Sequence, residues 1–167
     1  NFLQENIWMI GLGLVVVILV VALCYKNIKA FRKNLQYFLM HIPVVKDIII
    51  YNEITIFTKT FASLLANNVF ITDSMDILSK ITNNEIYKDI MNDTVKNIVK
   101  GDKISASFKD HWAIPDVAYY MIVTGESTGQ LAEMMKRVSD YYAEMHKSII
   151  TNLKSFIEPV LISILAL

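Results

Sequence analysis

The chain has little of what a disulfide-bonded, β-rich or nucleic-acid-binding protein needs. Among its 167 residues there are one cysteine, five glycines and three prolines. A single cysteine cannot form an internal disulfide framework, and β-rich folds need more turn residues than this. The formal charge of zero leaves no basic excess to neutralise phosphates, which argues against a nucleic-acid partner. These absences favour a helical fold.

Apolar sequence is abundant and makes up 54% of the chain. The segment from Ile7 to Tyr25 carries no charge and, at about 1.5 Å per residue, is long enough to cross a bilayer. A signal peptide is the alternative, but its basic residues would precede the apolar run, whereas here they follow it. The positive-inside tendency predicts residues 1–6 outside the membrane and the residues after Tyr25 in the cytoplasm. The residues that set this orientation are Lys26, Lys29, Arg32 and Lys33.

A second apolar run starts at Phe156 and continues to Leu167. It is too short to cross a bilayer, so we interpret it as the first part of a second transmembrane helix and the chain as a fragment. Glu158 lies near its start, and we expect this carboxylate to stay at the membrane interface, where its charge costs least. Pro159 is expected to kink the helix and form a hinge.

Between the two runs, apolar residues recur at spacings of three and four, which predicts an all-α fold. We expect about six helices in a compact cytoplasmic bundle over residues 26–155, with transmembrane helices in residues 1–25 and 156–167. The first helix is expected to continue from the membrane until Pro43 stops it. The last is expected to run unbroken from about Ser127 into the second apolar run. Movement of the bundle would then reach the membrane through two rigid helical stalks.

Turn and cap residues separate the predicted helices. Asn68 is expected to take a left-handed conformation after one helix, and Thr72 is expected to cap the next. Asn84 is expected to cap a helix that ends at Gly101, and Pro115 to open a later one.

Residues 125–129 read GESTG and match the G-x-S-x-G motif of serine hydrolases, with Asp140 and His146 following in the order of a catalytic triad. We expect Ser127 and His146 to lie on one helix, about 28 Å apart, which is far too long for proton transfer. The hydrolase fold also needs a sheet that this chain lacks. We therefore predict no catalytic residue and no enzyme activity.

We interpret this motif instead as a turn between two helices. Gly125 would end the first helix, and Ser127 or Thr128 would cap the second. Glu126 would lie near the positive end of that second helix.

No cofactor or metal site is predicted. The chain contains no P-loop sequence, and its three histidines, His41, His111 and His146, are isolated from one another and from cysteine. Two acidic pairs at helical spacing could attract a cation, although solvated helix faces are the preferred explanation: Asp89 with Asp93, and Asp140 with Glu144.

Taken together, several segments resemble the type II secretion F domain, which occurs twice in the PilC/GspF family of inner-membrane proteins. The resemblance covers nearly the whole chain and implies its C-terminal half, although Asn68 stands where the family usually has glycine and Phe70 where it usually has proline. The segments that carry it are Ile42-Pro43, the sequence FTKTFASLL at 57–65 with the turn at Asn67-Asn68, Gly101, Ile114-Pro115, Gly125-Glu126-x-x-Gly129-x-Leu131 and Pro159.

The resemblance implies a platform protein of a type IV pilus or type II secretion machine in the bacterial inner membrane. Such a protein would form homo-oligomers, contact lipid and other inner-membrane assembly proteins, and couple a cytoplasmic assembly ATPase to insertion or extraction of pilin or pseudopilin subunits. Coupling is expected at the stalk of residues 26–33 and at the turn that contains Gly125, Glu126, Gly129 and Leu131. The alternative is a membrane-tethered helical scaffold or signalling module that transmits no force.

Overall fold

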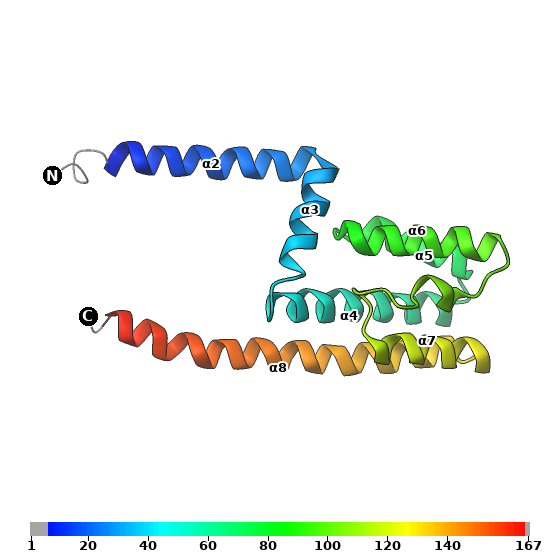
Figure 1. The fold of residues 1–167 in the computed structure, drawn as a ribbon. Helices are drawn as coiled ribbons and strands as arrows, with labels where there is room; N and C mark the ends of the chain where they lie inside the picture. The colour runs from blue at the N-terminus through cyan, green and yellow to red at the C-terminus, as the bar shows by residue number, and fades with distance from the viewer. Residues whose placement is uncertain (1–6, 166–167) are drawn as a thin grey trace.

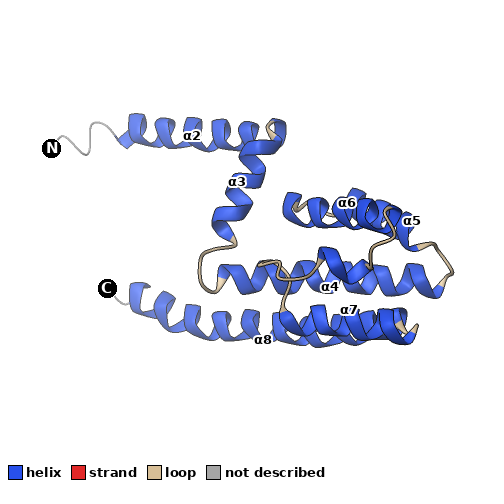
Figure 2. Ribbon diagram, turned by 45° about the vertical axis from the view of Figure 1, so that its right-hand side comes forward, coloured by secondary structure: helices blue, strands red, loops and turns tan. Residues whose placement is uncertain are grey.

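The computed structural model describes residues 7–165, which form helices joined by turns and contain no strand (Figures 1 and 2). This confirms the predicted all-α class. The elements are α2 (Ile7–Asn27), α3 (Lys29–Leu39), α4 (Val45–Ala66), α5 (Ile71–Ile81), α6 (Glu85–Val99), the short 3-10 helix η1 (Ile104–Ser107), α7 (Asp116–Thr128) and α8 (Leu131–Leu165).

Helix α4 forms the middle layer of the bundle, with α5 and α6 on one side and α7 and α8 on the other (Figure 1). Its apolar residues Ile54, Phe57 and Phe61 recur at the predicted spacing of three and four and are buried. The apolar periodicity does not predict burial at every position, since Ile81 and Val99, the last residues of α5 and α6, are 50% and 76% exposed. The rest of the core comes from every helix of the bundle and includes Met75, Leu78, Tyr87, Ile90, Phe108, Ile122, Met135, Val138 and Tyr142.

Most of the predicted turn residues are confirmed. Asn68 and Gly101 have φ angles of 58° and 90°, the left-handed region that asparagine and glycine tolerate best. The Asn84 side chain accepts a hydrogen bond from the N–H of Ile86 at 3.0 Å and so caps α6. Pro115 is the residue directly before α7.

The predicted cap at Thr72 is wrong. Helix α5 already begins at Ile71, and Phe70 occupies the cap position without a side-chain hydrogen bond. Phe70 has extended backbone angles and a side chain that is 77% exposed. Asp73 does lie in the first turn, where its charge favours the helix dipole.

The predicted straight stalk from the membrane to Pro43 is also wrong. The chain leaves the helical conformation at Ile28, and α3 runs at 108° to the part of α2 from Leu12 onward. Helix α3 then ends at Leu39, before Pro43. The apolar periodicity continues across the break and therefore did not reveal it.

The predicted long final helix is confirmed. Helix α8 has 35 residues and continues through Pro159, although it begins at Leu131 rather than near Ser127. Its first half packs in the bundle, whereas its last part, from Phe156 to Leu165, is exposed. Figure 1 shows this part of α8 and the whole of α2 projecting from the same side of the bundle, with the chain running in opposite directions.

By length and composition, two helices could cross a membrane, α4 and α8, and the bent pair of α2 and α3 would be a third if counted as one span. The apolar stretch of α4 differs from that of α8 in lying in the core, since 28% of it is buried and none of the apolar stretch of α8 is. Five side chains of α4 are buried, and α4 packs against α5 and α8.

Candidate functional site

The turn between α7 and α8 places Gly125 differently from the sequence prediction. Gly125 is buried inside α7, and a Cβ atom there would lie 2.9 Å from the Cα of Leu131 and 3.1 Å from Met134. Gly129 ends the helix instead, with a left-handed φ of 71°. Both interpretations of the turn use glycine, but Gly125 is needed for close contact between helices rather than for a cap.

Ser127 and Thr128 do not cap α8. They are the last residues of α7, and their hydroxyl groups donate hydrogen bonds back to the Thr124 carbonyl at 3.0 and 2.7 Å. The helix that follows begins only at Leu131, a buried residue. The predicted cap is therefore wrong, because both residues belong to the end of α7 and not to the start of α8.

Glu126 reaches a different helix from the one predicted. Its carboxylate accepts hydrogen bonds from the backbone N–H groups of Ile104 at 2.6 Å and Ser105 at 3.3 Å, and from the Ser105 hydroxyl at 2.7 Å. These donors lie at the start of η1, where N–H groups lack partners within the helix. Glu126 thus attaches the end of α7 to the loop that follows α6.

The hydrolase-like triad is not formed, for a reason that differs from the predicted one. Ser127 and His146 lie on two helices, α7 and α8, rather than on one. His146 lies 15 residues into α8, so the helical rise places it about 22 Å from Leu131, at the turn beside Ser127. That separation is much longer than a proton-transfer contact of about 3 Å.

Within residues 7–165, no three His, Cys, Asp or Glu side chains lie close enough together to hold a metal ion. Of the acidic residues considered for a cation, Asp89 pairs with Lys33 at 2.5 Å and Asp93 with Lys96 at 2.8 Å. These two carboxylates therefore already have charged partners.

Two of the four basic residues predicted to set membrane orientation bind α6. Arg32 pairs with Glu85, and Lys33 pairs with Asp89. Gln36, one turn further along α3, accepts a hydrogen bond from the Glu85 N–H at 2.8 Å and donates one to the Asn83 carbonyl at 3.0 Å. These polar contacts attach α3 to the first turn of α6.

Glu85 is the most buried carboxylate of this contact, with 11% of its side chain exposed. Burial by itself would raise its pKa, but the hydrogen bonds and charges of Lys88 and Arg32 outweigh burial and lower the pKa below its ordinary value. Glu85 therefore stays ionised and holds Arg32 in place. We call the contact of Arg32, Lys33 and Gln36 with the start of α6 the α3–α6 joint.

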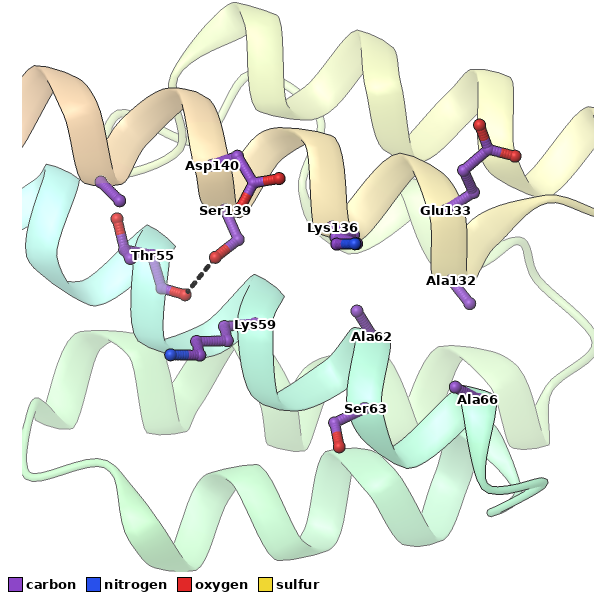
Figure 3. A pocket seen from close by; sticks show the side chains of 11 residues that line it. Thr55, Lys59, Ala62, Ser63, Ala66, Ala132, Glu133, Lys136, Ser139 and Asp140 are labelled. Carbon is purple, nitrogen blue, oxygen red and sulfur yellow. Dashed lines mark hydrogen bonds between the residues drawn. The ribbon is translucent and has the colours of Figure 1, made fainter.

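A groove of about 590 Å³ lies between α4 and α8. Figure 3 shows Ala62, Ala66 and Ala132 directed into it, and Ser139 donating a hydrogen bond to the Thr55 carbonyl at 3.4 Å. Lysine and carboxylate side chains also line the groove, but within the described residues the hydroxyl of Ser139 is hydrogen-bonded only to the Thr55 carbonyl and to none of them, so no base activates it. The groove is a gap between small side chains of two packed helices.

The geometry thus combines a helical bundle, two projecting apolar helices and no assembled catalytic group among residues 7–165. Comparison with known proteins agrees with the resemblance noted above. The family described as "Type II secretion system (T2SS), protein F" matches residues 57–167, which is more than half of the chain. The chain belongs to this family.

Curated relatives match this chain over stretches of 110 to 158 residues. Type IV pilus assembly protein PilC of Pseudomonas aeruginosa is 26% identical over 141 residues, which are 84% of this chain and 38% of that protein. PilC of Myxococcus xanthus is 25% identical over 158 residues, 95% of this chain and 38% of its own length. Type II secretion system protein F of Pseudomonas aeruginosa is 24% identical over 110 residues, 66% of this chain and 27% of that protein.

The chain therefore spans less than two fifths of the length of these relatives. Its matched region contains the α7–α8 turn and the whole of α8. The bend at Ile28 and the basic residues of the α3–α6 joint lie before the family match.

The partners of Arg32, Lys33 and Glu126 were not predicted from the sequence. Each partner lies more than 20 positions away in the sequence, between 21 and 56 residues. One signal was available for Arg32 and Lys33, because Glu85 and Asp89 are spaced by four residues on α6 and so lie on one face of that helix.

Proposed function

We propose that this chain is part of an inner-membrane platform protein of a type IV pilus or type II secretion machine. It couples a cytoplasmic assembly ATPase to the insertion or extraction of pilin or pseudopilin subunits. Residues 26–155 form its cytoplasmic domain, and α2 and the end of α8 cross the membrane in opposite directions. Homo-oligomers and other inner-membrane assembly proteins complete the machine around it.

The observation that carries this proposal is the position of the two exposed apolar segments. From Leu12 to Leu23, the large apolar side chains of α2 are 43–68% exposed, and Phe156 and Leu165 on α8 are 73% and 85% exposed. Apolar surfaces of this size need to be covered by lipid or protein. Because both segments leave the same side of the bundle, one bilayer can cover both (Figure 1).

Helix α4 stays in the cytoplasmic domain in this proposal, although it is apolar enough to span. Its side chains Ile54, Phe57 and Phe61 are at most 2% exposed. Exchanging these contacts for lipid would open the core, and the charged residues Glu53 and Lys59 would enter the bilayer.

Force transmission, as opposed to scaffolding, requires that α8 remains helical between the bundle and the membrane. We expect that inserting Gly-Ser-Gly-Ser between Asn152 and Leu153 abolishes piliation or secretion while the protein is still made and still binds its ATPase. The matched control inserts Ala-Ala-Ala-Ala at the same place. This insertion adds the same number of residues but keeps α8 helical. It rotates the end of α8 by about 40° beyond one full turn, so this variant should retain more pilus assembly or secretion than the Gly-Ser variant.

The measurements are pili or secreted protein per cell, membrane content of the variant, and recovery of the ATPase with it from detergent extract. Normal assembly with the Gly-Ser insertion would refute force transmission through α8. Recovery of a kinase or other regulator in place of the ATPase would favour the scaffold or signalling alternative.

A further inference from the structure

A cavity of about 220 Å³ adjoins the α3–α6 joint at the place where four helices meet. Helices α2, α3 and α4 and the turn before α6 each contribute to its wall. The polar residues that line it are Tyr25, Gln36, Glu53, Asn83 and Asn84. Of the described residues on this wall, only Glu53 carries a group that can become charged near neutral pH. The cavity therefore places one carboxyl group of α4 beside the contact that holds α3.

Glu53 is half-buried and lacks a cationic partner. None of the salt bridges formed by the described residues involves it. Within the same part of the chain, its carboxylate accepts a single hydrogen bond, from the Thr82 hydroxyl at 3.0 Å. The Thr82 hydroxyl accepts a hydrogen bond from the Asn84 N–H at 3.2 Å. An ionised carboxylate has about four acceptor positions, so one donor leaves most of them unfilled.

The groups around Glu53 favour its neutral form. Burial raises the pKa of Glu53 above its ordinary value of 4.5, and the hydrogen bond from Thr82 offsets only part of this effect. The groups that face Glu53 from other elements are Tyr25 of α2, Gln36 of α3, Thr82 after α5 and Tyr87 of α6. Amides and hydroxyls carry no charge near neutral pH, and phenols ionise only near pH 10. Nothing that faces Glu53 therefore compensates a negative charge there.

Gln36 lines the cavity and also belongs to the α3–α6 joint. Its side chain donates to the Asn83 carbonyl at 3.0 Å and accepts from the Glu85 N–H at 2.8 Å. A charge on Glu53 needs further donors, and the cavity has room for several water molecules at about 30 Å³ each. Water drawn into the cavity competes for the Gln36 amide. We expect ionisation of Glu53 to weaken the hold of Gln36 on the start of α6.

We infer that Glu53 is a proton-binding site that controls how firmly α3, and with it α2, is attached to the bundle. With the proton bound, the cavity stays dry and Gln36 keeps α3 against α6. With the proton lost, water enters the cavity and α3 loosens. The inference goes beyond the proposed function and requires no partner of the assembly machine.

The direction of the pH dependence follows from the raised pKa. The folded protein binds the Glu53 proton more tightly than the unfolded chain does, so its contribution to stability is complete below pH 4.5. That contribution is lost as the pH rises through the folded-state pKa. Glu85 has a lowered pKa and stays ionised above pH 4.5, so the two carboxyl groups act in different pH ranges.

Hydrogen exchange of the α3 amides in detergent, between about pH 5 and pH 8 and corrected for its intrinsic pH dependence, tests the inference. We expect exchange to accelerate at least about twofold as the pH rises. Glu53→Gln still accepts the hydrogen bond from Thr82 but does not titrate. This variant should exchange slowly at every pH in the range and melt at a higher temperature than the unsubstituted protein at pH 8. The matched control is Glu144→Gln, on an exposed part of α8, which should leave the pH response unchanged.

Thr82→Val separates control of the proton from a structural role. The Thr82 hydroxyl favours the ionised form of Glu53, so its removal should move the midpoint of the α3 response to higher pH. A side chain with only a structural role would change the rate of exchange and leave that midpoint in place.

Three results would overturn the inference. The first is an unsubstituted protein whose α3 exchange does not change between pH 5 and pH 8. The second is a pH response that persists in Glu53→Gln. The third is a lower melting temperature of Glu53→Gln at pH 8, because the ionised carboxylate would then be stabilising. Each of these results would leave the proposed function intact, since the experiment measures only the attachment of α3.

Discussion

The bundle is joined to its two apolar helices in different ways. Helix α8 is continuous from the core to the apolar end, and its residues Met135, Val138 and Tyr142 are buried in the bundle. Helix α2 is joined through a 108° bend and through the polar contacts of the α3–α6 joint. A displacement of the bundle must therefore carry α8 with it, whereas α2 follows only as far as the joint holds.

The largest effect is expected from disturbing the close contact that keeps α8 in the bundle. Gly125→Val would place a branched side chain 2.9 Å or less from the backbone of Leu131, which cannot rotate away. We expect a loss of about 3 kcal/mol in the free energy of unfolding, at the upper end of overpacking effects. Urea unfolding in detergent, followed by Trp112 fluorescence, measures it.

The matched control for this prediction is Gly13→Val in α2. A Cβ atom at Gly13 would meet no heavy atom within 4 Å, so the change is expected to stay within about 0.5 kcal/mol. Equal losses for the two variants would mean that the α7–α8 contact does not hold α8 to the bundle.

The sequence predicted those features that depend on neighbouring residues. Asn84 caps the helix that starts directly after it, and Gly101 ends the same helix, because a cap needs only the adjacent backbone. The all-α class and the length of α8 follow from periodicity in the same way.

Features decided by distant contacts were not predicted. The break at Ile28 occurs within an unbroken apolar pattern, and the residues that hold α3 in its new direction bind partners 47–56 positions away. Gly125 was assigned to a cap because a glycine near a helix end usually has that role. Its actual requirement, contact with Leu131, appears only when α7 and α8 are packed together.

A smaller effect is expected from removing the charge that holds α3. Arg32→Met leaves Glu85 with Lys88 as its remaining charged partner, at 3.3 Å. We expect a loss of about 1.5–3 kcal/mol for hydrogen bonds to a charged group that is mostly buried. The loss should appear first as faster hydrogen exchange of the α3 amides, since α8 is not touched by the change.

Lys33→Met is the matched control, because it removes a neighbouring charge from the same helix. Lys33 and Asp89 are both more than half exposed, and water screens such pairs strongly. Exchange in α3 should therefore change less than in Arg32→Met. A larger change in exchange for Lys33→Met than for Arg32→Met would mean that the α3–α6 joint depends mainly on Asp89 rather than on Glu85.

The smallest effect is expected from acid, which weakens the α3–α6 joint without any substitution. Burial opposes ionisation of Glu85, but Lys88 and Arg32 together hold its pKa below the ordinary value of 4.5. A lowered folded-state pKa means that the contribution of Glu85 to stability is complete above pH 4.5 and is lost as the pH falls through the folded-state value. Exchange of the α3 amides, compared at neutral and acidic pH, should therefore accelerate in acid beyond its intrinsic pH dependence, whereas exchange in the buried half of α8 should not.

Glu85→Gln should remove most of this acid dependence, because glutamine does not titrate. An unchanged acid response in that variant would show that another carboxylate controls the joint, and the difference between the two connections would then not rest on Glu85.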